Sequence, residues 1–273
     1  MRHLLRLDDW TTDDTDAVFA LARAYEQGTG PVLDGAAAVF FPPTSLRTRA
    51  SFERGAALAG LQPIVFPPES LDKDEAHEDV ARYLADFVDV LVVRHRDLSV
   101  LEALAAADAV PVVNAMTSVN HPCEVLADLW ALTRGRAVGS LRVRFVGADG
   151  NIARAWAEAS RLFGFDLLQC CPEGLGAPDV VWTEDLAGAM ADADVVVTDG
   201  PGRHAAALEP YRVTADVLAL APDGVRFAPC PPFVRGREVS ADAIASPAFV
   251  GHGAKRALLP VQQAVLAHCL AGA

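Results

Sequence analysis

Short apolar runs alternate with alanine-rich stretches along almost the whole chain, and this alternation restricts the fold more than any other feature. The runs are rich in Val, Leu and Phe and occur at 36–41, 89–93, 110–114, 142–147, 165–170, 193–198 and 225–229. Helical spacing predicts helices at about 12–26, 46–60, 75–86, 122–134, 151–163, 184–192 and 256–270. Apolar strands separated by helices are typical of a parallel sheet covered on both faces. We therefore predict an α/β fold with doubly wound parallel sheets.

The length of the chain and one polar stretch suggest two domains. A chain of 273 residues with 52% hydrophobic residues can build two ordinary domains, each with its own core. The polar, glycine-bearing stretch 134–140 lies between a predicted helix and the next strand, and it is the natural seam. We predict one domain at 1–134 and a second at 141–254. The apolar helix at 255–271 must pack on another element, and we expect it to return to the first domain.

The acidic composition limits the partners of this protein. With 23 basic and 36 acidic residues the formal net charge is -13, whereas nucleic acids and anionic membranes need a positive surface. The N-terminal segment MRHLLRLDDW becomes acidic within eight residues and lacks the apolar region of a signal peptide. No apolar run reaches the roughly 18 residues of a membrane span. Five cysteines without C-x-x-C or a pairing with histidine indicate no metal site and favour a reducing compartment. We predict a cytoplasmic protein that binds neither nucleic acid nor membrane.

A cluster of arginines and hydroxyls follows the first predicted strand. The stretch PPTSLRTR leads into a helix, with Ser45 as the expected N-cap and Arg47 and Thr48 in the first turn. A helix start beyond the carboxyl end of a parallel strand offers N–H groups and a positive dipole to an anion. The stretch fits a phosphate site and fits equally well a solvated helix face on which Arg49 pairs with Glu53.

Two further strand ends favour the phosphate site. Arg94 stands where the strand DVLVV stops, and the strand VPVVN leads through a polar turn into a helix that begins HPCE, with His121 and Glu124. Three strand ends would then point polar groups into one crevice. Together, SLRTRASFE, VVRHRD and HPCEVLADLWAL resemble the aspartate and ornithine carbamoyltransferases, which carry Ser-Thr-Arg-Thr-Arg, a strand-end Arg and His-Pro-x-Gln-x-Leu-x-Asp in this order. The resemblance extends nearly from end to end.

The resemblance implies a donor site for carbamoyl phosphate. The phosphate would be held by Ser45, Arg47 and Thr48, together with the backbone N–H of Leu46. The carbamoyl oxygen would be polarised by Arg94, His121 and Thr48. Attack of an amine on the carbamoyl carbon builds an oxyanion and expels phosphate, so positive charges and N–H donors at both ends suit this reaction.

The resemblance also implies an assembly. In such enzymes the active site lies in the cleft between two domains of a homotrimer and uses no metal or organic cofactor. The stretch 69–79 resembles the loop that reaches into the neighbouring subunit's site, with Ser70 and Lys73 as the candidate residues. An exposed loop with a solvated lysine accounts for this stretch at least as well.

The second half resembles the acceptor domain of the ornithine type. GADGNI lies between a strand and a helix but is not a G-x-G-x-x-G motif, so a nicotinamide site is not expected, and Asn151 matches a family Asn. Asp199 ends a strand where the ornithine type has an Asp that contacts the acceptor's amino end. The segment APCPPFVRGREV (228–239) resembles the family segment that lines the acceptor site. In it, Cys230 is either a wall of the acceptor pocket or a small buried residue, and Pro231 stands where the family has Leu. Arg256 resembles a further donor to the carbamoyl oxygen, although its spacing to the final helix differs.

Three departures from the family pattern concern both pockets. Leu46 replaces a Thr of the phosphate site, and Glu124 replaces the Gln of His-Pro-x-Gln. A Ser-Met-Gly stretch expected after Asp199 is missing. Glu124 either complements the dipole at a helix start, or pairs with Arg94, or contacts a cationic acceptor.

The predicted function is carbamoyl transfer from carbamoyl phosphate to an amine of an ornithine-like amino acid, which gives a ureido product and phosphate. Two alternatives stay open at this point. One is a transferase that uses a different phosphorylated donor, because Leu46 and Glu124 alter the donor site. The other is a non-catalytic family member with a regulatory or binding role, although such a protein has no reason to keep the polar groups of three strand ends aimed at one point.

Overall fold

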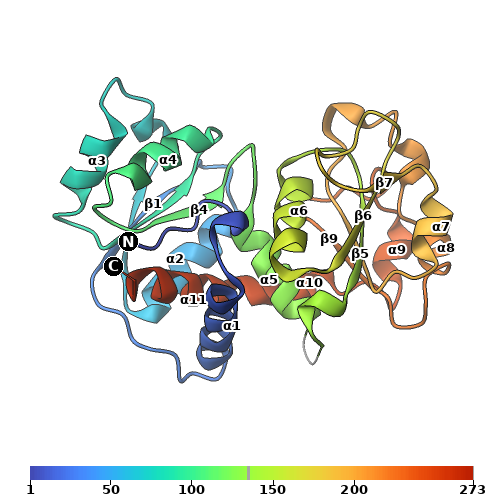
Figure 1. Ribbon diagram of the computed structural model, residues 1–273, viewed down its shortest axis with the longest axis horizontal. Helices are drawn as coiled ribbons and strands as arrows, with labels where there is room; N and C mark the ends of the chain where they lie inside the picture. The colour runs from blue at the N-terminus through green and yellow to red at the C-terminus, as the bar shows by residue number, and fades with distance from the viewer. Residues whose placement is uncertain (134–135, 273) are drawn as a thin grey trace. The chain divides into compact units, whose positions relative to one another are not determined.

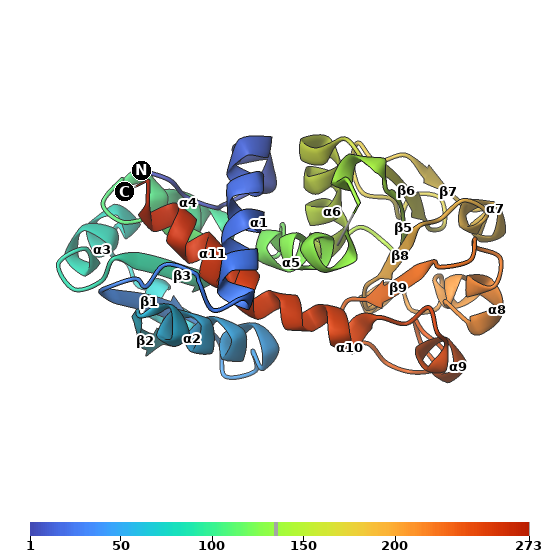
Figure 2. The ribbon, with the colours of Figure 1, turned by 90° about the horizontal axis from the view of Figure 1, so that it is seen from below.

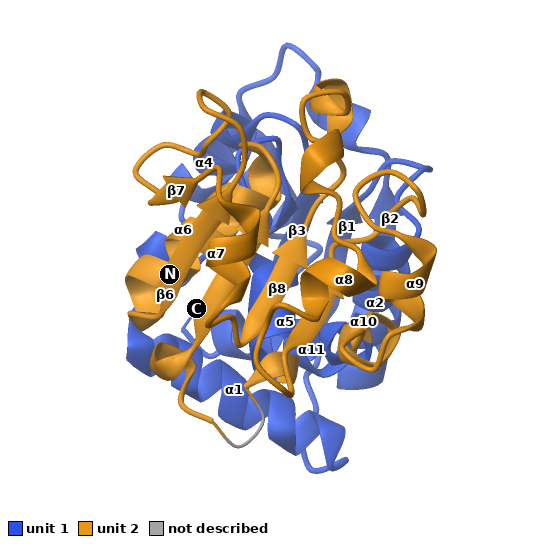
Figure 3. Cartoon of the chain, turned by 90° about the vertical axis from the view of Figure 1, so that its right-hand side faces the viewer, with its two compact units in different colours: residues 1–130, 256–273 blue, residues 131–255 orange. Residues whose placement is uncertain are grey.

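The computed structural model describes residues 1–133 and 136–272 and divides into two compact units (Figure 3). The first unit contains residues 1–130 and 256–273, and the second contains residues 131–255. Each unit has one parallel sheet with helices, so the predicted α/β class is confirmed. Arg134 and Gly135, at the start of the predicted seam, lie outside the described residues.

The first unit contains a four-stranded sheet. Its strands and helices are α1 (Thr12–Glu26), β1 (Ala36–Phe40), α2 (Arg47–Ala59), β2 (Gln62–Phe66), α3 (His77–Leu84), β3 (Val90–Arg94), α4 (Leu98–Ala106), β4 (Val112–Met116), α5 (Pro122–Leu132) and α11 (Leu258–Leu270). The last two residues of α5 belong to the second unit. The strand order is β2-β1-β3-β4 and all neighbours are parallel.

The central strands of this sheet form the core of the first unit. Leu91 and Val93 of β3 and Leu101 and Leu104 of α4 are fully buried and belong to one apolar cluster. Each such side chain contributes about 1.5–3 kcal/mol when it leaves water. This rigid centre fixes the carboxyl ends of β1 and β3, from which the candidate site is built.

The last helix, α11, lies against α1 and α2 in the first unit (Figures 1 and 2). It is buried along most of its length, and the short 3₁₀ turn Lys255–Ala257 precedes it. The two chain ends also meet, because the Arg2 guanidinium donates to the carbonyl oxygen of His268 at 3.1 Å. The helix therefore supports α2, which begins with the arginine cluster.

The second unit contains a five-stranded parallel sheet in the order β7-β6-β5-β8-β9. Its elements are β5 (Arg142–Val146), α6 (Asn151–Phe163), β6 (Asp166–Cys170), β7 (Trp182–Thr183), α7 (Leu186–Met190), β8 (Val195–Thr198), α8 (Ala215–Leu218), β9 (Arg226–Pro229), α9 (Ala241–Ala245) and α10 (Gly251–Ala254). In the described part of the chain, no helix is both long enough and apolar enough to cross a membrane.

The sequence analysis did not predict several of these elements, and the reasons can be identified. β2 contains Gln62 and Pro63 and is only partly buried, because it forms an edge of its sheet, where proline is tolerated. α4 is so apolar that it lacks the polar face by which a helix is recognised. β7, α8 and α9 are only two to five residues long.

Candidate functional site

Each sheet has one place where the chain order reverses, and ligands of such folds bind there, beyond the carboxyl ends of the strands. In the first unit the chain runs from β1 to β2 on one side and to β3 on the other, so this place lies between β1 and β3. In the second unit it lies between β5 and β8 for the same reason. The predicted donor residues follow β1 and β3, and Asp199 follows β8.

In the first unit, Arg94 connects the two strand ends. Its guanidinium Nη1 donates to the Oγ of Ser45 at 3.1 Å, and Ser45 is only 3% exposed. The prediction that Ser45 is the N-cap of α2 is wrong. Leu46 occupies the N-cap position, and its side chain makes no capping hydrogen bond. Arg94 holds the Ser45 hydroxyl instead, which fixes the loop between β1 and α2.

The start of α2 has the character of an anion site. Arg47 and Thr48 lie in the first turn as predicted, Thr48 is buried, and that turn contains no acidic residue. The N–H groups of a first helical turn have no partner within the helix and point toward any ligand at its end. Arg49 differs from Arg47, because its Nε donates to Glu53 at 2.5 Å along the helix. The two arginines of the cluster therefore have separate environments. The Arg49–Glu53 pair is present, and the role of Arg47 in a phosphate site stays a prediction.

Leu46 is 74% exposed, although it stands between Ser45 and Arg47. Its backbone N–H stays at the start of α2, where the sequence analysis expected it to serve the anion.

His121 and Glu124 are buried beside this site. Glu124 lies in the first turn of α5, is 5% exposed, and its Oε2 is 3.9 Å from His121 Nε2. Burial lowers the pKa of Arg94, and the negative charge of Glu124 raises it in opposition. The charge of Glu124 thus favours the charged form of Arg94. The site combines Arg94 and His121 with one buried carboxylate.

A cavity of about 420 Å³ adjoins Arg94 in the first unit. It is lined by residues that follow β1, β3 and β4 and by the segment after β2, namely Pro42, Pro68, Glu69, Asp72, Arg94, His95, Arg96, Met116, Thr117 and Ser118. His95 is buried, and its Nε2 lies 3.0 Å from an Asp72 oxygen. The sequence analysis missed His95 and Asp72, whose proximity no local pattern indicates.

The remaining predicted donor-side residues lie at the surface. Lys73 is exposed just after the 3₁₀ turn Pro68–Leu71, which contains Ser70. Arg256 is exposed in the turn that precedes α11. The structure therefore brings Ser45, Arg94 and the start of α2 together. Among the described residues, no contact holds the side chain of Lys73 or Arg256 toward this site.

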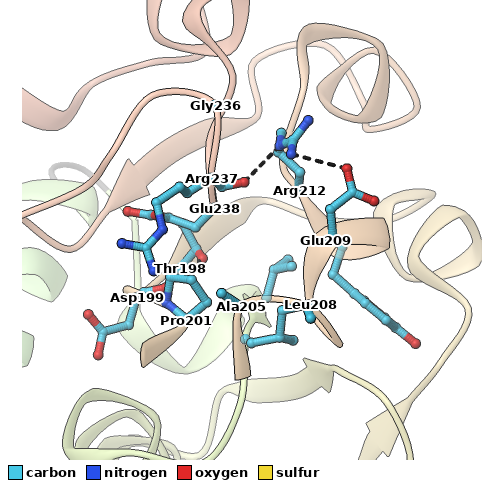
Figure 4. Close-up of a pocket in the computed structure, with 14 residues that line it drawn as sticks. Thr198, Asp199, Pro201, Ala205, Leu208, Glu209, Arg212, Gly236, Arg237 and Glu238 are labelled. Carbon is cyan, nitrogen blue, oxygen red and sulfur yellow. Dashed lines mark hydrogen bonds and ion pairs between the residues drawn. The ribbon is translucent and has the colours of Figure 1, made fainter. Parts of the chain in front are cut away.

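In the second unit, Asp199 follows β8 and Asn151 begins α6. The nearby Asp149 is occupied by Arg154, with two hydrogen bonds of 2.7 and 2.5 Å. Cys230 is 8% exposed after β9, and the peptide bond between Pro231 and Pro232 is cis. Asp199 lines a cavity of about 320 Å³, drawn in Figure 4. The sequence analysis missed Glu238 in this cavity, although it lies only two residues after Gly236 of the quoted segment.

Comparison with known proteins identifies the family. The carbamoyl-P binding domain model of aspartate/ornithine carbamoyltransferase matches residues 2–134, and the Asp/Orn binding domain model matches residues 140–269. The chain belongs to the aspartate/ornithine carbamoyltransferase family. It is 33% identical to an ornithine carbamoyltransferase of Geobacter metallireducens over an alignment of 301 positions that covers 98% of this chain and 99% of the relative.

Solved structures agree with this membership. The chain is similar to ornithine carbamoyltransferase from Burkholderia thailandensis, with a TM-score of 0.91 and 28% identity over 100% of this chain and 99% of the other. It is similar to the enzyme from Pyrococcus furiosus with a TM-score of 0.92 and 28% identity over 100% and 98%. The resemblance that the three motifs indicated is confirmed, and the family consists of carbamoyltransferases.

Among residues 1–133 and 136–272, no group of three His, Cys, Asp or Glu side chains is arranged to hold a metal ion.

Proposed function

We propose that this carbamoyltransferase family member moves the carbamoyl group of carbamoyl phosphate to an amine of an ornithine-like amino acid, giving a ureido product and phosphate. The contact between Arg94 and Ser45 is the observation that supports this most directly. It joins the ends of β1 and β3 at the place where such sheets bind ligands. A guanidinium and the start of a helix then lie together at this place, which suits a donor with a phosphate dianion at one end and a carbonyl oxygen that becomes negative during the reaction at the other.

The donor's phosphate is held at the start of α2. Arg47, the Thr48 hydroxyl, the Ser45 hydroxyl and the N–H groups of the first turn, including that of Leu46, are the donors. Each hydrogen bond to a phosphate oxygen is charge-assisted and about twice as strong as a neutral one. Because α2 has no acidic residue in its first turn, the helix dipole adds to this attraction.

The carbamoyl oxygen is polarised by Arg94, His121 and Thr48. When the amine attacks, its lone pair forms the new C–N bond and the carbonyl electrons move onto this oxygen. The bond between carbon and phosphate oxygen then breaks, the phosphate leaves with that electron pair, and the amine loses its proton to phosphate or water. Donors placed at the oxyanion before the reaction stabilise this transition state without reorganisation. The protein needs no covalent nucleophile for these steps.

Glu124 accepts a hydrogen bond from the carbamoyl NH₂ group in this proposal. A carboxylate does this as well as the family's glutamine, but it brings a negative charge near the phosphate. Its burial beside His121 and its effect on Arg94 offset part of that repulsion, because both partners can carry positive charge. Glu124 therefore positions the donor and keeps Arg94 charged.

Asn151 and Asp199 contact the acceptor's polar end, and Cys230 and Pro231 form an apolar wall beside it. Asp199 follows β8 and Cys230 follows β9, which are neighbouring strands of one sheet. Arg256 is a further donor to the carbamoyl oxygen in this proposal. The acceptor amine attacks only in its neutral form, so the rate rises with pH toward the pKa of that amine.

A homotrimer in the cytoplasm completes the proposal. Lys73 and Ser70, on the segment after β2, reach the site of the neighbouring subunit, for which the exposure of Lys73 and of the edge strand β2 is favourable. Exposed apolar residues near this edge, Leu46 and Val65, suit a protein interface. None of the five cysteines, all of which lie among the described residues, forms a disulfide, and this supports a reducing compartment.

Calorimetry with carbamoyl phosphate tests the donor, with inorganic phosphate as the control ligand. We expect carbamoyl phosphate to bind more tightly than phosphate, and we expect phosphate release when ornithine is added. Arg47→Gln and Arg94→Gln should each weaken donor binding by roughly tenfold to a hundredfold, since each removes a charge-assisted bond of about 1.5–3 kcal/mol. Arg49→Gln is the matched control, because Arg49 is engaged with Glu53. Equal affinity for phosphate and carbamoyl phosphate would show that the donor is a different phosphorylated compound.

A further inference from the structure

The turn between β4 and α5 leads to His121 and contains a buried polar network. Asn114 of β4, Thr117 and Asn120 are at most 1% exposed, although each has a polar side chain. Buried polar side chains are tolerated where hydrogen bonds compensate for the lost contact with water. Asn120 directly precedes His121, and α5 begins one residue later. Contacts that fix Asn120 therefore also fix the backbone from which the His121 side chain extends.

The side chain of Asn120 is at the centre of this network. Its Oδ1 accepts hydrogen bonds from Asn114 Nδ2 at 2.6 Å and from the Thr117 hydroxyl at 3.1 Å. Its Nδ2 donates to the Leu5 carbonyl oxygen at 3.1 Å, and Asn114 Nδ2 donates to the same oxygen at 2.9 Å. The Thr117 hydroxyl oxygen also accepts from the backbone N–H of Asn120 at 3.1 Å. One side chain thus joins β4, the turn that follows it and the N-terminal segment.

The N-terminal segment reaches this network because it pairs with β4. The Leu4 N–H donates to the Val112 carbonyl oxygen at 2.9 Å, and the Asn114 N–H donates to the Leu4 carbonyl oxygen at 2.8 Å. β4 is the last strand of its sheet, so this pairing covers part of an edge. A carbonyl group 115 positions earlier in the chain therefore helps to orient the Asn120 amide.

The network has one position that reduces stability. The Nδ2 of Asn114 donates to both Leu5 and Asn120, whereas its Oδ1 is buried and has no hydrogen-bond partner among the residues that the structure describes. An open acceptor in the interior destabilises the folded state, and a network with such an acceptor is less stable than an apolar core. A polar network that carries this cost indicates that the position of the turn matters.

We propose that Asn120 is a positioning residue for His121. Its amide holds the turn from Thr117 to Asn120 in one conformation and so directs the His121 ring toward the carbamoyl oxygen. Asn114 and Thr117 act with it, because both donate to its Oδ1. A group that is misplaced by about 1 Å can reduce the rate by about a hundredfold. The inference rests on the proposed function in one respect, namely that His121 polarises the carbamoyl oxygen.

Phosphate release from carbamoyl phosphate with ornithine, measured per folded molecule, tests this inference. Asn120→Ala should lower kcat by about tenfold to a hundredfold, because a donor to the oxyanion is then misplaced. The Kd of carbamoyl phosphate, measured by calorimetry, should change by less than about threefold, since the charge on the oxygen develops in the transition state. Thr117→Val removes the hydroxyl that donates to Asn120 and should also lower kcat, whereas Thr117→Ser keeps this hydroxyl and should retain kcat within about threefold.

Thr15→Val separates positioning from stability. Thr15 of α1 is fully buried, and its hydroxyl donates to the Thr12 carbonyl oxygen at 2.9 Å. Urea unfolding should therefore show a loss of stability, while kcat of the folded Thr15→Val protein should stay unchanged. An unchanged kcat in Asn120→Ala, or an equal loss of kcat in Thr15→Val, would overturn the inference. If Asn120→Ala does not fold, equal kcat values for Thr117→Val and Thr117→Ser would overturn it.

Labelling with diethyl pyrocarbonate, which modifies accessible imidazoles, distinguishes a failure of this inference from a failure of the proposed function. His121 is 5% exposed, so its labelling, located by mass spectrometry, should be slow. It should be at least about tenfold faster in Asn120→Ala and unchanged in Thr15→Val, with exposed His252 as the reference. Faster labelling in Asn120→Ala without any phosphate release by the unaltered protein keeps the network and refutes carbamoyl transfer to ornithine. Equal labelling of the unaltered protein and Asn120→Ala removes only the positioning role, whether or not phosphate is released.

Discussion

Replacing Asp14 with asparagine should destabilise the first unit by an amount that its contacts allow us to calculate. Asp14 forms the capping box of α1, in which its Oδ2 accepts from the backbone N–H of Thr11 at 3.0 Å and from the hydroxyl at 2.7 Å. Its Oδ1 lies 3.0 Å from His268 Nε2 and 3.2 Å from Arg2 Nε. The carboxylate thus connects the start of α1 with the end of α11 and with the N-terminal segment.

The pKa of Asp14 gives the magnitude. Burial alone would raise it, but the hydrogen bonds from Thr11, the hydrogen bond with His268 and the charge of Arg2 lower it from 3.8 to about 2. At about 1.36 kcal/mol for each pKa unit, this lowering corresponds to about 2 kcal/mol of folding free energy. The folded-state pKa lies below the unfolded one, so this stabilisation is present above pH 4 and is lost as the pH falls toward 2. Roughly half of it remains at pH 3.

Urea unfolding of the unaltered protein and of Asp14→Asn at pH 7 and pH 3 tests the calculation. We expect a difference in unfolding free energy of about 2 kcal/mol at pH 7 and about half as much at pH 3. Asp13→Asn is the control, because Asp13 is exposed in the same helical turn and should matter by less than about 1 kcal/mol at either pH. A difference for Asp14→Asn that is equal at the two pH values would refute the reasoning, since the ionised carboxylate would then not be its source.

Three further predictions concern buried groups. Glu124→Gln should strengthen the binding of inorganic phosphate by about tenfold or more in calorimetry, because it removes a buried negative charge that repels the phosphate. This repulsion amounts to about 1 kcal/mol per unit charge at 4 Å in water and to about 4 kcal/mol at an effective dielectric constant of 20. Unchanged affinity would place Glu124 outside the donor site. Gln262→Met should raise the free energy of unfolding, measured in urea, by about 1–3 kcal/mol. The Gln262 side chain is fully buried, and neither of its amide atoms has a hydrogen-bond partner among the described residues. A loss of stability would contradict this reasoning, because it would mean that the amide has a partner. Burial raises the pKa of Cys171 to about 11 and of Cys269 to about 12, so neither thiol should react with a disulfide reagent at pH 8 until the protein is unfolded; fast labelling of either in the native protein would contradict this.

The strands of the centre of each sheet were predictable because their residues alternate with helices and are apolar throughout. β3 is buried along four of its five residues, so its signal does not depend on what packs against it. The last strand residue, Arg94, was predictable as a site residue for the same reason, since it is the first charged group after an apolar run. Edge strands lack this signal, and β2 was missed because only part of it is buried.

Predictions from local sequence rules were wrong where a residue distant in the chain offered a competing hydrogen bond. Ser45 has the composition of an N-cap, yet its hydroxyl bonds to Arg94, which is 49 residues away in the chain. Serine side chains make either bond, and a charged donor gives the stronger one. The same limit applies to Glu238, which lines a cavity formed by three separate segments. Sequence analysis identifies residues near strand ends but not the partners that they find.

The acidic net charge and the proposed phosphate site are compatible because local charges at the strand ends decide what binds there. In the first unit, Arg47 and Arg94 stand at the reversal point between β1 and β3. In the second unit, Asp199 and Glu238 stand at the reversal point between β5 and β8. In the proposed reaction the donor anion would meet the first pair of residues and the acceptor's amino end would meet Asp199, whatever the formal net charge of -13. If Arg94→Gln weakened amine binding as strongly as Asp199→Asn, this division between the units would be wrong, and the two charges would act on a single ligand.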